Sequence, residues 1–159
     1  MELDNKEKEY MAYIDEHISN VQNAYLKYGE TLCKLLNISP FDLFEKVAIH
    51  DQSKYSEEEF DAYRNYFYPC TDEKRNKEEF DIAWKHHYEN NPHHPEYWKG
   101  KDMCNIAIAE MLLDWEAMSV KFHGNTYDYY LKERDNKGFS DNTKHILDKI
   151  VKEVFGVDK

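Results

Sequence analysis

The chain has 159 residues and a formal net charge of −11, with 21 Lys and Arg against 32 Asp and Glu. This length predicts a single domain, residues 1–159, that is large enough to bury a core. The acidic balance argues against a nucleic-acid polymer as partner, because such binding needs clustered basic side chains that displace counterions. A small phosphorylated substrate stays compatible with this charge, since a bound metal ion would offset it.

No segment of the sequence predicts membrane insertion or secretion. No run approaches the roughly 18 apolar residues of a membrane span, and the polar first residues do not resemble a signal peptide. The three cysteines, Cys33, Cys70 and Cys104, are widely spaced and form no CxxC motif, as expected of reduced thiols. We therefore expect a soluble cytoplasmic protein without a membrane partner, and the sequence leaves its oligomeric state open.

Apolar residues at spacings of three and four predict helices along the chain, and no useful stretch alternates like a strand. The first expected helix covers about residues 4–36. A second begins at Ser39-Pro40, because serine is a favoured N-cap and proline a favoured first residue. Apolar residues near its end predict that the following pair, His50-Asp51, points inward. These residues are Phe44, Val47, Ala48 and Ile49.

The middle of the chain contains further helix signals. Ser56 and Glu59 have the spacing of a capping box, which predicts another helix start. The acidic run 57–59 is then expected to be solvated at that start. A fourth helix is expected over residues 77–90, and it ends before Pro92 because the residue preceding a proline is pushed out of the helical region.

The last third predicts two more helices. Asp102 is a possible cap for the fifth, which ends irregularly in the tyrosine-rich segment 121–138. Ser140 begins the last one. The sequence therefore predicts an all-α bundle of about six helices.

Imidazole and carboxylate side chains recur at positions expected to face inward. They are His17, His50, Asp51, His87, one or both of His93 and His94, and Asp114. A mixed set of nitrogen and oxygen donors suits a divalent metal ion, and it does not distinguish Mn, Fe, Co, Ni, Zn and Mg. A carboxylate such as Asp51 can also bridge two ions, so either one or two ions are compatible with this set.

Each of these residues has a structural alternative. His17 is alternatively a hydrogen-bonded core histidine, and the His50-Asp51 pair a helix-terminal cap. Asp114 could pair with a buried basic side chain instead. Glu110, one turn before Asp114, is either a group that supports the metal site or acts in proton transfer, or a structural salt-bridge partner.

Four residues are candidates for substrate binding. Lys54 and Arg64 could contact a phosphate, although both could equally be surface charges. His93 could contact substrate instead of metal, and Trp98 beside it could stack on a base. Three other histidines are expected at the surface, namely His86, His123 and His145.

The arrangement of His17, His50-Asp51 and Asp114 on helices resembles the ligand set of the HD superfamily of metal-dependent phosphohydrolases. Residues 50–54 are similar to the HDxxK signature of that superfamily. This resemblance implies an HD-like helical bundle in which these four residues hold a metal ion. It also implies that the lysine of the signature lies near the substrate phosphate.

Other segments extend the resemblance. His87 and His93-His94 resemble the extra histidines of the two-metal branch of that superfamily. Ser53 replaces the glycine that is commonest in the HDxGK form, which leaves the substrate open. The segments HDxSKYSxEEF and AWxHHxxxNPHHPEYW also resemble a family of small uncharacterised bacterial and phage proteins, known as a domain of unknown function.

The sequence therefore predicts a metal-dependent phosphohydrolase that uses metal-activated water on a nucleotide or nucleotide-like phosphoester. Lys54 and Glu110 are its candidate catalytic residues, beside the metal ligands. One alternative is a di-iron oxygenase on the same HD-like fold. The other is a non-catalytic helical binding protein that contains a metal ion.

Overall fold

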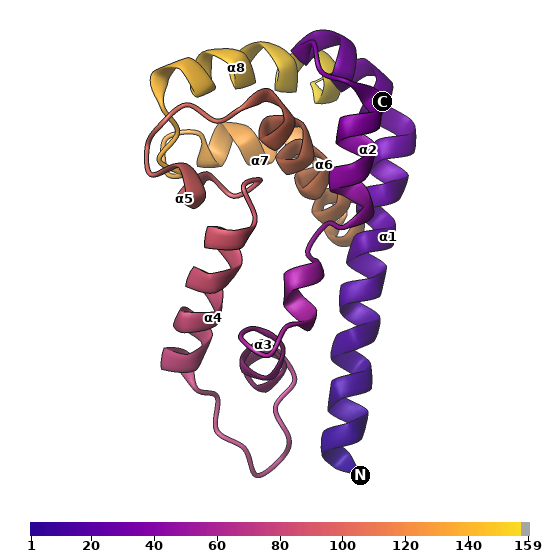
Figure 1. Ribbon diagram of the computed structural model, residues 1–159, viewed down its shortest axis with the longest axis vertical. Helices are drawn as coiled ribbons and strands as arrows, with labels where there is room; N and C mark the ends of the chain where they lie inside the picture. The colour runs from indigo at the N-terminus through magenta and orange to yellow at the C-terminus, as the bar shows by residue number, and fades with distance from the viewer. Residues whose placement is uncertain (157–159) are drawn as a thin grey trace.

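The structure is a computed structural model that describes residues 1–156 and is drawn in Figure 1. Residues 157–159 of the predicted domain lie outside the described part. Within residues 1–156 there are eight α-helices, α1–α8, one 3₁₀ helix, η1, and no strand. The all-α prediction is confirmed, whereas the expected count of six helices is too low. No helix in this part of the chain is both long and apolar enough to cross a membrane.

The longest element is α1, Glu2–Leu36, which follows the predicted bounds and runs along one side of the molecule (Figure 1). Its buried side chains recur every three or four residues, as an amphipathic helix requires. Asn37 ends it in the left-handed region at φ 53°, and its N–H donates to the carbonyl of Cys33. Asparagine tolerates this conformation better than most residues, so the stop is encoded locally.

The central element is α6, Asn105–Phe122, which packs along α1. Every residue from 107 to 117 is buried, including three carboxylates, so this helix has no solvent face over three turns. The predicted cap is wrong: Cys104 is the N-cap residue, and Asp102 instead accepts a hydrogen bond from Ser140 Oγ at 2.6 Å.

Three helices complete the larger core around α6 and the C-terminal half of α1: α2, Pro40–Ala48; α7, Thr126–Glu133; and α8, Asp141–Phe155. The predicted starts of α2 and α8 are confirmed, because the hydroxyls of Ser39 and Ser140 accept backbone N–H bonds from their third helical residues.

The segment 121–138 was expected to be irregular, and α7 corrects this prediction. The helix has an ordinary N-cap, since the side chain of Asn125 accepts from the N–H of Asp128. Only Thr126 and Tyr130 in it are buried. Two buried positions in eight residues give no readable helical period, which explains why the apolar pattern missed it.

A smaller core joins the N-terminal half of α1 to α3, Phe60–Phe67, and α4, Lys77–Asn90. The predicted bounds of α4 are confirmed. The predicted capping box before α3 is wrong, because Ser56 Oγ has no hydrogen-bond partner in the described chain and the Glu59 side chain is fully buried.

The two cores meet on α1 next to His17. Ile18 belongs to the smaller cluster and Val21 to the larger one, so the boundary between them falls within one turn of that histidine. The short elements η1, Gln52–Tyr55, and α5, Pro95–Trp98, lie in the connections that precede α3 and follow α4. The junction is where polar side chains from several elements can meet inside the molecule.

Candidate metal centre

The His50-Asp51 pair lies in the tight connection between α2 and η1. Asp51 adopts the left-handed region at φ 57°, and both side chains are almost completely buried. An apolar end of α2 was expected to direct the pair inward. This expectation was wrong, since Phe44 is 51% and Ile49 62% exposed. The backbone turn at Asp51, rather than an apolar helix end, directs the pair inward.

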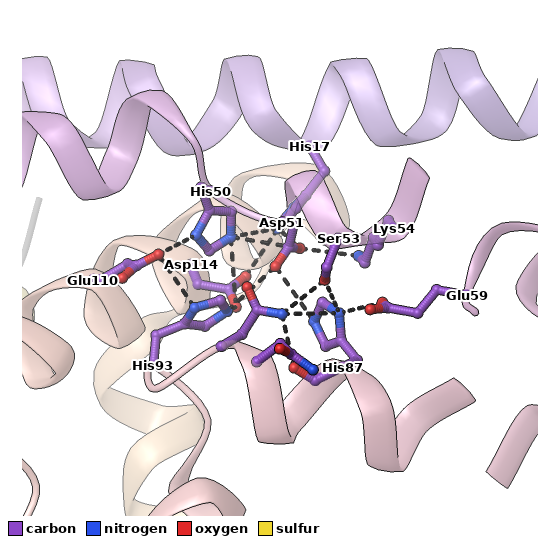
Figure 2. Close-up of polar contacts among 12 residues, drawn as sticks. His17, His50, Asp51, Ser53, Lys54, Glu59, His87, His93, Glu110 and Asp114 are labelled. Atoms are coloured by element: carbon purple, nitrogen blue, oxygen red, sulfur yellow. Dashed lines mark hydrogen bonds and ion pairs between the residues drawn. The ribbon is translucent and has the colours of Figure 1, made fainter. Parts of the chain in front are cut away.

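His17 of α1 and Asp114 of α6 face this pair across the core junction. His17 Nε2 lies 3.0 Å from Asp114 Oδ1 and 3.3 Å from His50 Nε2. All four predicted ligands of the first ion therefore converge, although they come from three separate parts of the chain (Figure 2).

The Asp51 carboxylate lies between two sets of imidazoles. Its Oδ2 is 3.5 Å from both His17 Nε2 and His50 Nε2. Its Oδ1 is 3.4 Å from both His87 Nε2 and His93 Nε2. One carboxylate thus presents a different oxygen to each histidine pair, as a bridging ligand does.

His93 follows α4 in the loop before α5, and its ring is buried. Besides Asp51, its Nε2 lies 3.4 Å from Asp114 Oδ2. The rings of His94 and His87 meet edge to face, with 4.8 Å between ring centres. Both histidines are therefore at the centre, and the structure assigns the closer carboxylate contacts to His93.

Three groups of donor atoms have the mutual spacing of metal ligands. Each group lies within 4.8 Å: Asp51, His87, His93 and His94; His17, His50 and Asp51; and His50, His93 and Asp114. Donors about 2.1 Å from one tetrahedral ion would be about 3.4 Å apart, which is the separation observed around both Asp51 oxygens. These buried groups could hold a metal ion.

Buried atoms without a hydrogen-bond partner also indicate that these residues fit a metal ion. Asp51 Oδ1, His93 Nε2 and His94 Nε2 are buried and form no hydrogen bond in residues 1–156. Buried polar atoms are normally hydrogen-bonded, so such atoms facing one another need another explanation. A cation between them would satisfy all three, because each offers a lone pair and none needs to donate.

A second layer of carboxylates holds the outer edges of the imidazoles. Glu110 Oε1 lies 3.0 Å from His50 Nδ1 and 3.2 Å from His93 Nδ1 (Figure 2). A carboxylate only accepts, so the Nδ1 atom of His50 carries the proton and its Nε2 lone pair faces the centre. This is the arrangement by which carboxylates orient metal-binding histidines. His93 Nδ1 lies near the same oxygen but forms no hydrogen bond in residues 1–156. Glu110 holds His50 in this way and lies beside His93.

Glu59 holds the outer nitrogens of two histidines of α4. The sequence did not predict this role, because Glu59 lies in an acidic run that was expected to be solvated. Its Oε1 lies 2.7 Å from His87 Nδ1, and its Oε2 lies 2.7 Å from His86 Nδ1. His86, expected at the surface, is thus hydrogen-bonded and only 31% exposed. Ser53 Oγ also lies 3.3 Å from His87 Nδ1, and Asn91 donates to that hydroxyl.

The side chains of the centre strongly lower the pKa of its aspartates. Burial would raise the pKa of Asp51, but the neighbouring His50 and Lys54 side chains hold it well below its usual value. Burial would also raise the pKa of Asp114, but the His17 and His93 side chains that face its oxygens hold it well below its usual value. Both acids are therefore ionised at neutral pH and available as ligands.

Lys54 belongs to the same cluster. Its Nζ lies 3.0 Å from Asp51 Oδ2. Burial would lower its pKa, but the Asp51 charge raises it, so the side chain is an ammonium. Lys54 also lines the adjoining cavity, which puts a positive charge where the candidate centre meets open space.

A cavity of about 330 Å³ adjoins the centre. Side chains from the candidate centre form part of its wall: His17, Asp51, His87, His94 and Asp114. Aromatic side chains form much of the remainder: Tyr10, Tyr13, Tyr63, Phe67, Phe80, Trp84, Trp115 and Tyr129. This is the size and character of a small-molecule site.

Two predicted substrate contacts lie elsewhere. Arg64 is buried in an ion pair with Glu73, with 2.9 Å between its NH2 nitrogen and Glu73 Oε1, and it is not part of the cavity wall. Trp98 donates from Nε1 to the carbonyl of Pro92 at 2.7 Å and packs against the larger core. Both side chains have structural partners.

Comparison with known proteins places the chain in one family. No curated protein and no solved structure matches it. The resemblance to the HD superfamily therefore stays a prediction. The expected resemblance to a domain of unknown function is confirmed by a family model. A family model described as "Family of unknown function (DUF5662)" matches residues 6–153. The chain belongs to this family.

Proposed function

We propose that the protein is a metal-dependent phosphohydrolase that acts on a nucleotide or nucleotide-like phosphoester. The observation that supports this most directly is the Asp51 carboxylate, whose two oxygens face separate histidine pairs at 3.4–3.5 Å. A bridging carboxylate of this kind is typical of two-metal sites for phosphoryl transfer. The ions, when bound, would supply Lewis acidity that activates water at neutral pH and offsets phosphate charge.

The chain's own residues have separate tasks in this proposal. His17, His50, Asp51 and Asp114 would hold one ion, and His87, His93 and His94 would hold the other with Asp51. Glu110 is a positioning residue here rather than a proton donor, because both its contacts go to imidazoles and it is not part of the cavity wall.

Lys54 would steady the substrate phosphate. Its ammonium group lies beside Asp51 and lines the cavity, so an entering phosphate would meet a positive charge next to the ions. The aromatic wall of the cavity would hold an apolar or flat remainder of the substrate. The protein thus combines a charged end for the phosphate with a wall suited to a base.

Elemental analysis followed by activity measurement tests this proposal. We expect metal in the purified protein, and release of inorganic phosphate from nucleoside monophosphates in the presence of Mn, Co, Ni, Mg or Fe. Metal-free protein treated with chelator should be inactive and should recover when the ion is returned. Metal-loaded protein that releases no phosphate from any phosphomonoester would refute the hydrolase.

One observation favours a second candidate. His87, His93 and one Asp51 oxygen form a two-histidine, one-carboxylate group, which is the ligand set of many non-haem iron oxygenases. A di-iron oxygenase would contain iron, and it would consume oxygen when substrate is added. Bound iron without oxygen consumption or phosphate release would favour a non-catalytic binding protein.

A further inference from the structure

Two oppositely charged side chains line the cavity but do not belong to the candidate metal centre. Glu96 comes from α5 and Lys137 from the segment that follows α7. Glu96 Oε2 is buried and has no hydrogen-bond partner in residues 1–156. A buried carboxylate oxygen without a partner is costly, so it indicates a missing donor beside Glu96.

Lys137 is held in place by an aromatic neighbour. Its Nζ lies 5.6 Å from the ring centre of Tyr129, which lines the same cavity. Burial would lower the pKa of Lys137, but the neighbouring Tyr129 and Glu96 side chains raise it. Glu96 and Lys137 therefore put a carboxylate acceptor and an ammonium donor on the wall of the same cavity.

Flat side chains complete this part of the wall. Trp84 of α4 and Trp115 of α6 both line the cavity. Trp115 meets the Tyr129 ring edge-on, with 5.1 Å between ring centres, which fixes the orientation of both rings. Such aromatic faces bind planar heterocycles by stacking.

These groups together define a hydrogen-bonding pattern. A carboxylate only accepts and an ammonium only donates, so a ligand that pairs with both side chains has N–H donors for Glu96 and a carbonyl oxygen for Lys137. Among the common bases guanine has these groups on one edge, with its ring N–H and amino group next to O6. Adenine and cytosine present an acceptor nitrogen beside the amino group, which would face the carboxylate unfavourably. Uracil has a single N–H between two carbonyls.

We propose that the substrate is a guanine nucleoside monophosphate, selected by Glu96 and Lys137. This inference rests on the proposed phosphohydrolase, because the phosphate is expected at Lys54 and the ions. The cavity volume of about 330 Å³ is at the lower end of the range for ligand sites, which suits a mononucleotide rather than a polymer.

Binding and turnover are measured separately with the metal-loaded protein. Isothermal titration with guanosine and adenosine reports base recognition without any reaction, and phosphate release from GMP and AMP reports hydrolysis. We expect GMP to exceed AMP in kcat/KM, and guanosine to exceed adenosine in affinity, by about ten- to a hundredfold, as for a hydrogen bond to a charged group. Glu96→Gln and Lys137→Met should each remove most of this preference.

Matched controls make the same substitutions at positions outside the cavity. Glu89→Gln on α4 and Lys132→Met on α7 alter exposed side chains that are not part of the cavity wall, and both should keep the preference for guanine. Circular dichroism of all four variants checks that the helices are intact. A preference that survives Glu96→Gln in a folded protein overturns the proposal.

The remaining outcomes separate the two proposals. Equal hydrolysis of GMP and AMP would leave the hydrolase intact and overturn the guanine specificity. Guanosine binding that depends on Glu96, without any phosphate release, would support the recognition and reject the hydrolase. Failure to bind either nucleoside would overturn the specificity by itself.

Discussion

His87 Nδ1 lies 2.7 Å from Oε1 of Glu59, whose side chain is fully buried. A charged acceptor at this distance fixes the imidazole and leaves its Nε2 facing Asp51. We expect Glu59→Gln to weaken binding of the second ion by roughly 10- to 100-fold, as loss of such an outer partner usually does. Metal titration followed by equilibrium dialysis measures this affinity directly.

The neighbouring Glu57 provides the control for this variant. Its side chain is exposed, so Glu57→Gln changes the charge by the same amount two residues away. We expect unaltered metal affinity in that protein. Equal metal affinity in Glu59→Gln and Glu57→Gln would show that the buried carboxylate has no role in metal binding.

Asp51→Asn should remove metal binding and activity while the helices persist. Asparagine accepts the left-handed backbone found at this position, so the variant isolates the loss of charge from backbone strain. Elemental analysis should find almost no metal, and far-UV circular dichroism should be unchanged. His145→Ala, at an exposed position, should retain the full metal content. Full occupancy in Asp51→Asn would rule out the assigned centre.

Glu110→Gln should reduce affinity for both ions, because this carboxylate faces the outer nitrogens of His50 and His93. A loss of roughly 10- to 100-fold is expected. Glu116→Gln is the matched control on the same helix, since Glu116 is also buried but accepts from Thr126. If both variants lose metal equally, the effect comes from damage to α6 rather than from the centre.

Removal of metal should lower the thermal stability of the protein. An ion that binds only the folded chain at 100 times its dissociation constant adds about 2.7 kcal/mol. For a chain of this size that corresponds to roughly 5–10 °C in Tm. Differential scanning calorimetry with and without chelator provides the measurement. Identical curves in excess ion and in chelator would contradict metal binding to the native state.

Asp148 should make stability depend on pH below neutrality. Its hydrogen bond from Arg134, aided by that from Tyr130, lowers its pKa from 3.8 to about 2. Because the folded pKa is the lower one, the stabilisation is present above pH 4 and is lost as the pH falls toward 2. The side chain is 43% exposed, so solvent screening reduces the contribution to about 1 kcal/mol.

Urea unfolding of Asp148→Asn and of the unaltered protein tests this dependence. The difference in unfolding free energy should be largest near neutral pH and should shrink toward pH 2. A difference that stays constant over this range would mean that the hydrogen bonds do not depend on the charge of Asp148.

Local signals in the sequence were enough to predict much of the fold. The starts of α2 and α8 follow from a serine with a favourable first turn, and the bounds of α1 and α4 follow from apolar spacing and Pro92. These features depend on residues within a few positions of one another. Helix α7 was missed because it buries only two side chains, and its stability comes from packing on α6 and α8.

The inner histidines and acids of the centre could be identified because each is a ligand type on an apolar helix face or beside a turn. Their outer partners could not. Glu59 occurs in a run of three glutamates, and only the fold shows that it is buried while its two neighbours are exposed. The partner of Arg64 could not be predicted for the same reason, since Glu73 is nine residues away in a loop.

The left-handed backbone of Asp51 limits which residues selection can place there. Glutamate would keep the negative charge but would strain this backbone and push the carboxylate outward by one methylene. Glycine and asparagine would fit the backbone but would give up the charge. A library of all substitutions at this codon should therefore contain no functional replacement, so the position would stay fixed even in a lineage that exchanged its metal or its substrate.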